Sequence, residues 1–179
     1  VDIGGQNKNC KLEVISDPRI SVADEDFAEQ HDLYGGVVAK LSELNIAVNR
    51  VRLMKQQLKN MHKIMPEENK RIDELIASLD NVEGSLIDTK RETPRDVLRH
   101  EAGLDDTLIN LLWVIKIADS KPPLQTKEVT EDVFRQVDGV LSKLESLIKN
   151  EITDFNELIA KASPPTISSS SVGAPKTGW

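Results

Sequence analysis

The sequence predicts an all-α protein, an antiparallel up-down helical bundle preceded by one β-strand. From Phe27 onward, apolar residues recur every three or four positions over most of the chain, which is the spacing of one helix face. Aromatic residues make up only 3% of the 179 residues, so the core must consist mainly of Leu, Ile and Val. No strand-like run follows residue 16, which argues against an alternating βαβ fold.

The predicted strand lies at residues 11–14, where Lys-Leu-Glu-Val alternates polar and apolar side chains. Asp17-Pro18 ends this alternation. A strand without a partner leaves its N–H and C=O groups unpaired, so a lone strand before a helical region is unusual.

A first helix is expected to begin near Ser21 or Asp24, either of which can cap it. Gly35-Gly36 inside it would allow a close backbone approach or mark a bend. Lys55 and His62 share the register of its apolar positions. We expect these two residues where the seam, the stripe formed by those apolar positions, widens. Those apolar positions are Tyr34, Val37, Leu41, Leu44, Val48, Val51, Leu58 and Met65.

Three further helices are expected. Pro66 begins the second, Thr93-Pro94 begins the third, and Thr126 caps the fourth after the helix-ending Pro122-Pro123. The second seam is Ile72, Leu75, Leu79, Val82 and Leu86. The third seam is Val97, Leu104, Leu108, Leu111, Ile115 and Ala118. The fourth seam is Phe134, Val137, Leu141, Leu144, Ile148, Phe155 and Leu158.

Short breaks between heptad-spaced segments predict antiparallel neighbours in a left-handed bundle over residues 21–162. If the chain only kinks at Pro94, the second and third helices become one rod and the bundle has three helices. Residues 163–179 have the Ser- and Pro-rich composition of a flexible tail.

Charge and hydropathy exclude two classes of partner. The formal net charge of −7 argues against nucleic-acid binding, which needs clustered Lys and Arg. The longest apolar run, from Leu108 to Ala118, is shorter than the roughly 20 residues that span a bilayer. Cys10 is the sole cysteine, so the chain cannot form an internal disulfide.

No catalytic, cofactor-binding or metal-ligating residue is predicted. The sequence lacks a Gly-rich phosphate loop and the CxxC, HExxH and GxSxG motifs. Asp105-Asp106 and Glu67-Glu68 are interpreted as solvated charges at helix starts. The histidines His31, His62 and His100 fall on three different predicted helices. One alternative remains, a histidine phosphotransfer bundle that would use an exposed His31 or His62.

Several short motifs resemble a known family. Asp17-Pro18-Arg19 joins the strand to an acidic helix start. The other matching stretches are NIAVNRVR at residues 45–52, TK at 89–90, ADSKPP at 118–123 and FNELI at 155–159. Together they resemble the C-terminal region of bacterial proteins with sortilin-like BNR-repeat propellers, often described as glycosyl-hydrolase or sialidase-like.

The resemblance implies a non-catalytic module at the end of an exported protein, periplasmic or secreted. In that family a short β-sandwich follows the propeller, so residues 1–20 would be its last strand and a linker. The family's active centre would lie in the propeller, and no catalytic residue carries over to this chain.

One candidate interaction patch is predicted on the third helix. With Leu108, Leu111 and Ile115 on the inward seam, Ile109 and Trp113 project to the opposite side, one turn apart. The expected partner is the upstream β-domain of the parent chain or another protein. A free-standing, dimerising bundle is the remaining alternative. If another part of the chain covers this pair instead, Trp113 belongs to the core.

Overall fold

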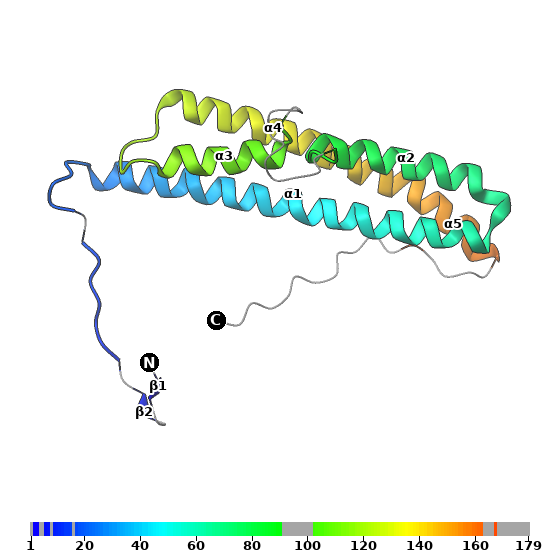
Figure 1. The fold of residues 1–179 in the computed structure, drawn as a ribbon, viewed down its shortest axis with the longest axis horizontal. Coiled ribbons are helices and arrows are strands. Elements are labelled where there is room, and N and C mark those ends of the chain that lie inside the picture. Colours follow the sequence, from blue (N-terminus) through cyan, green and yellow to red (C-terminus); the bar gives the residue numbers. More distant parts are fainter. Residues whose placement is uncertain are drawn as a thin grey trace.

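A computed structural model describes residues 2–3, 6–7, 9–15, 17–90, 102–162 and 167 (Figure 1). Helix α1 (Asp24–Ile64) leads through a 3₁₀ turn, η1 (Pro66–Glu68), into α2 (Asn69–Leu86). Helix α3 (Leu104–Lys116) is followed by α4 (Leu124–Leu147), a π-helical turn, η2 (Ile148–Ile152), and α5 (Thr153–Ala162). Because α4, η2 and α5 form one continuous helix, the described residues contain the four helices that the sequence predicts.

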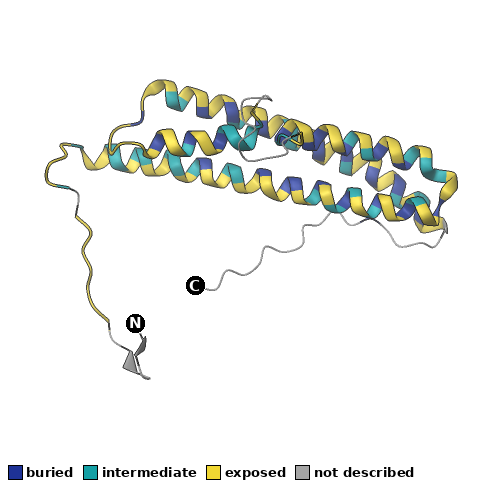
Figure 2. Ribbon diagram, in the orientation of Figure 1, coloured by how far each residue is buried: buried dark blue, intermediate teal, exposed yellow. Residues whose placement is uncertain are grey.

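The strand predicted at residues 11–14 is absent from the structure. Residues 9–15 have no regular secondary structure, and Leu12, Val14 and Ile15 are highly exposed (Figure 2). Two very short strands, β1 (Asp2–Ile3) and β2 (Gln6–Asn7), precede this stretch and pair antiparallel with each other. Among the described residues no strand pairs with this stretch, and a strand without a partner leaves its backbone N–H and C=O groups unpaired.

Helices α2 and α3 lie end to end along α1, and both run antiparallel to it (Figure 1). Side-chain contacts between α1 and the other two helices show the direction in which α2 and α3 run. His62 pairs with Asp73 at 2.7 Å and Lys55 with Glu83 at 2.7 Å, whereas the Gln30 side chain reaches the carbonyl of Ile115 at 2.6 Å. Partner numbers therefore rise through α2 and then α3 as the chain is followed back along α1.

Helix α4 runs in the same direction as α1. Lys127 pairs with Glu29 near the start of both helices. Further along, Asp138 lies 2.7 Å from Lys40, and Glu145 lies 2.6 Å from Arg50. The helices thus form three columns, one of α1, one of α2 and α3, and one of α4 and α5.

The lengths of the helices explain why successive helices are not all antiparallel neighbours, although the sequence predicted that they would be. The 41 residues of α1 extend about 62 Å, whereas α2 with 18 residues and α3 with 13 reach only about 27 Å and 20 Å. Neither short helix alone can cover α1, whereas the two in succession cover about three quarters of its length. Successive helices are therefore not all antiparallel neighbours, because α2 and α3 run in the same direction.

Gly103 lies where α3 meets the end of α2. A Cβ atom at this position would lie 2.8 Å from the backbone nitrogen of Asp88 and 3.0 Å from Cα of Ile87. The absence of a side chain therefore lets α3 begin directly against the residues that end α2. The helix start predicted at Thr93-Pro94 lies outside the described residues, as does Val97.

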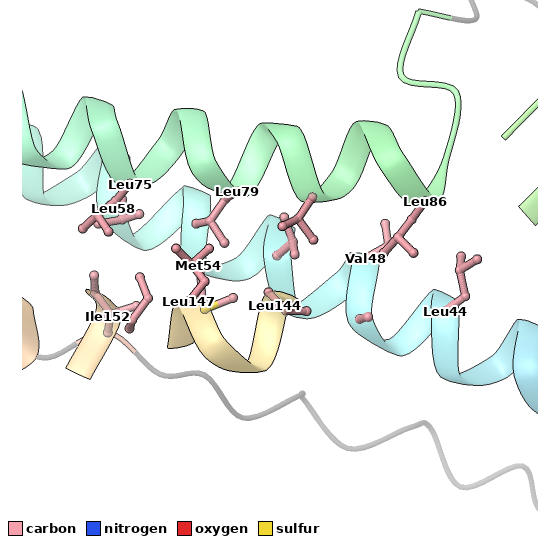
Figure 3. Packing of buried hydrophobic residues seen from close by; sticks show 14 of the residues in the cluster. Leu44, Val48, Met54, Leu58, Leu75, Leu79, Leu86, Leu144, Leu147 and Ile152 are labelled. Atoms are coloured by element: carbon pink, nitrogen blue, oxygen red, sulfur yellow. The ribbon is translucent and has the colours of Figure 1, made fainter. Parts of the chain in front are cut away.

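The core lies between the three columns, where Leu, Ile, Val and Met side chains meet (Figure 3). All five residues predicted for the second seam are buried. On α1, Val48 is buried as predicted, while Lys55 and His62 lie at the edge of the core. The residues one position before these three are also buried: Ala47, Met54 and Met61. Ala118 was expected on the third seam but is exposed, because α3 ends at Lys116.

The π-helical turn changes which residues of the last column face inward. Heptad spacing after Leu144 would place Glu151 towards the core, but the wider turn buries Ile152 instead. The Thr153 hydroxyl donates to the carbonyl of Ile148 at 3.0 Å, which satisfies an acceptor within this turn. In α5 Phe155 is fully buried as predicted, and Ile159 is fully buried in place of Leu158, which is half-buried.

Candidate interaction surface

Helix α3 is buried on one side and apolar on the other. Leu108 is fully buried, and Leu111 and Ile115 are nearly so. On the outer side, Ile109 is 40% exposed and Trp113 is 63% exposed. The structure therefore places both residues of the predicted patch outside the core.

The sequence analysis missed two neighbours of this pair. Ile117, directly after α3, is exposed, and it continues the four-residue spacing of Ile109 and Trp113. Val114, next to the indole, is also exposed. The repeated interval of four residues was the signal in the sequence. We refer to Ile109, Trp113, Val114 and Ile117 as the α3 surface.

The orientation of α3 is fixed at its C-terminal end by α1. The Gln30 amide donates to the carbonyl oxygens of Ile115 at 2.6 Å and Ala118 at 2.7 Å. The Ile115 carbonyl belongs to the last turn of α3, where carbonyls lack a partner within the helix. Because the end of α3 is held to α1 in this way, the helix keeps Trp113 on the outside.

A cation lies beside the exposed indole. The Lys116 ammonium is 4.6 Å from the centroid of the Trp113 ring, within the range of a cation–π contact. Trp113 thus presents a large apolar ring with a neighbouring positive charge, and tryptophan is enriched at protein contacts.

A groove of about 440 Å³ adjoins this helix at its boundary with α1. Phe27 and Tyr34 contribute aromatic rings, and Ile115 and Lys116 contribute the α3 side. His31 is exposed and also lines the groove. The groove therefore offers apolar surface with a few polar groups, the composition of a small binding site.

The stretch before α1 provides a second exposed apolar surface. Leu12, Val14 and Ile15 are the large apolar side chains of residues 9–15, and all three are exposed. β-Branched residues in an extended stretch suit addition to the edge of a sheet.

Charged side chains of the described residues join neighbouring helices through ion pairs. His62 lies 2.7 Å from Asp73, and His100 is outside the described residues. Among the described residues, no group of three or more His, Cys, Asp or Glu side chains is placed to hold a metal ion. None of the helices described is both long and apolar enough to cross a bilayer.

A buried carboxylate that the sequence analysis did not single out lies between α1 and α2. Glu83 is only 5% exposed and accepts hydrogen bonds from Arg52 at 2.6 Å and Lys55 at 2.7 Å. Burial alone would raise the pKa of Glu83, but the bonds from Lys55 and Arg52 outweigh it and lower that pKa. This network joins α1 to α2, and its three side chains line a groove of about 420 Å³ beside Asp88 and Thr89.

No family model matches this chain, and comparison with curated proteins and with solved structures found no significant match.

Proposed function

We propose that this chain is a non-catalytic helical module that binds a protein partner through the α3 surface. The observation that carries the proposal is the 63% exposure of Trp113 on a helix whose opposite face is fully buried. Exposed tryptophan leaves a large apolar area in water, and such residues are enriched among those that dominate binding energy.

The partner that fits best is a β-domain preceding the module in the same protein. The exposed apolar stretch at residues 12–15 supports this, because it can complete a sheet whose other strands the preceding domain supplies. The resemblance to the C-terminal region of BNR-repeat propeller proteins supports the same arrangement. The parent protein would then be exported, and its glycosyl-hydrolase-like chemistry would belong to the propeller.

Unfolding in denaturant tests whether the Trp113 side chain contributes to the stability of the fold. Trp113→Ala should change the free energy of unfolding by no more than about 0.5 kcal/mol, as for other surface substitutions. The buried Leu108 provides the matched control, because Leu108→Ala on the opposite face should cost about 2–5 kcal/mol. A loss of about 3–5 kcal/mol for Trp113→Ala would assign it to the core.

A second candidate function is histidine phosphotransfer, because His31 is exposed beside a groove. Incubation with a phosphodonor followed by detection of acid-labile phosphate distinguishes the two functions. Phosphate on His31 that His31→Ala abolishes would favour the signalling function. A free-standing homodimer is the other alternative, and the mass of the chain in solution identifies it.

A further inference from the structure

Helix α5 holds the backbone of a residue that lies beyond its end. The Nδ2 group of Asn156 donates to the carbonyl oxygen of Ile167 at 3.1 Å. The Oδ1 atom of the same side chain accepts the N–H of Ile167 at 2.9 Å. One carboxamide therefore satisfies both backbone polar groups of one residue.

The chemistry of a carboxamide explains this pairing. Its oxygen acceptor and its NH₂ donor lie in one plane, side by side. In a β-ladder, two residues directly opposite each other exchange both N–H···O bonds in the same way. Asn156 thus acts as a neighbouring strand would, and recognises a backbone independently of the side chain that the backbone carries.

The side chain of the captured residue adds the selectivity. Ile167 is only 4% exposed and belongs to the same buried cluster as Ile152, Phe155 and Ile159. Those three residues form the inward face of the last column, and Asn156 lies half-buried at its edge. A polar or charged side chain in the place of Ile167 would lose this burial.

We propose that this edge of α5 is a binding site for an extended peptide with a branched aliphatic side chain, and that Ile167 occupies it in cis. In the sequence, Ile167 is the one large apolar residue between Ala162 and Val172, so the segment offers a single anchor. The site is separate from the α3 surface and does not depend on its function. A peptide in trans must compete with a tethered anchor, whose effective concentration is in the millimolar range.

A labelled peptide tests the site. The probe is a fluorescein-labelled peptide with the sequence of residues 163–171, and fluorescence anisotropy is measured on the full chain. Ile167→Ser removes the anchor in cis, so this variant should bind the peptide at least about tenfold more tightly than the unmodified chain. Adding Asn156→Ala to that variant, or replacing isoleucine by serine in the peptide, should abolish binding.

The proposal is overturned if the Ile167→Ser variant does not bind the probe up to the millimolar range, or if Asn156→Ala leaves its affinity unchanged. Amide hydrogen exchange provides a second measurement on the unmodified chain, which does not depend on how that variant folds. The Ile167 amide should exchange slowly, and Asn156→Ala should remove this protection. Exchange of Ile167 at the rate of an unstructured peptide would also overturn the proposal.

Discussion

Gly103 and Glu83 show how single residues determine the way in which the helices meet. Gly103 brings the start of α3 within contact of Ile87 and Asp88 at the end of α2. Glu83 places a carboxylate at a nearly buried position and is neutralised by Arg52 and Lys55 from α1. The first contact depends on the absence of a side chain, and the second depends on complete pairing of a buried charge.

Alanine at two glycines should have opposite effects. Gly103→Ala introduces a methyl group 2.8 Å from the Asp88 backbone nitrogen, so it should destabilise the fold by about 1–3 kcal/mol. Gly35→Ala is the control, because its Cβ would enter open space within α1 and should stabilise the helix by about 0.5–1 kcal/mol. Unfolding in urea measures both. Equal effects of the two substitutions would contradict the close contact at Gly103.

Glu83 should make the stability depend on pH in the acid range. Its pKa is lowered in the folded state from an ordinary value of 4.5, so its contribution is complete above that pH. The contribution is lost as the pH falls through the lowered pKa, because protonation removes the charge that Lys55 and Arg52 stabilise. Glu83→Gln should therefore flatten this part of the curve of unfolding free energy against pH.

Glu145→Gln is the matched control for that measurement. Glu145 also pairs with an arginine of α1, but its side chain is largely exposed and contributes little. The pH profile of Glu145→Gln should follow that of the unmodified chain. If the profile of Glu83→Gln does so as well, the buried network does not stabilise the fold.

The spacing of apolar residues in the sequence predicted where Lys55 and His62 lie, but not their partners. The register of Lys55 and His62 placed both near the first seam, and the structure finds them at its edge with acidic partners on α2. Their partners could not be predicted, because they depend on how α2 lies along α1. The pairing of Asn156 with Ile167 has no periodic signal, since it joins a helix to a residue beyond that helix.

At the scale of elements, the π-helical turn after α4 is the feature that heptad spacing does not predict. In the last column Val137 and Leu144 are buried as expected, whereas Phe134 and Leu141 are half-buried and Val133 is buried beside Phe134. Beyond Leu144, regular heptad spacing would bring Glu151 towards the core. The wider turn leaves Glu151 exposed and brings Ile152 inward.

Truncation of neighbouring residues tests this change of register. Ile152→Ala should cost about 2–4 kcal/mol, because the side chain is almost completely buried. Glu151→Ala should change stability by no more than about 0.5 kcal/mol, although regular heptad spacing would give residue 151 the core position. Thermal unfolding of both variants decides the register, and a larger loss at Glu151 would contradict the π-helical turn.

At the scale of the whole molecule, three columns of similar length enclose one core. Apolar spacing predicted four helices because each seam is a local property of the sequence. The succession of α2 and α3 within one column is not local. It follows from the excess length of α1 over either short helix, together with the tight contact at Gly103.

The helical columns should fold without the residues before them. Leu12, Val14 and Ile15 are exposed, so residues 9–15 contribute little to the core. Deletion of residues 1–16 should leave a cooperative thermal transition by circular dichroism, with a midpoint close to that of the full chain. Loss of cooperativity would show that the deleted residues form part of the fold.

The measurement that tests the proposed function most directly is the affinity of this chain for the proposed β-domain partner, expressed separately. Isothermal titration should show binding, and Trp113→Ala should weaken it at least about tenfold while the unfolding free energy stays unchanged. Val129→Ala is the control, because this residue is an exposed apolar side chain on α4 and should leave the affinity unaltered. Equal affinity of the Trp113→Ala variant and the unmodified chain, or an upstream sequence without a β-domain, would contradict the account.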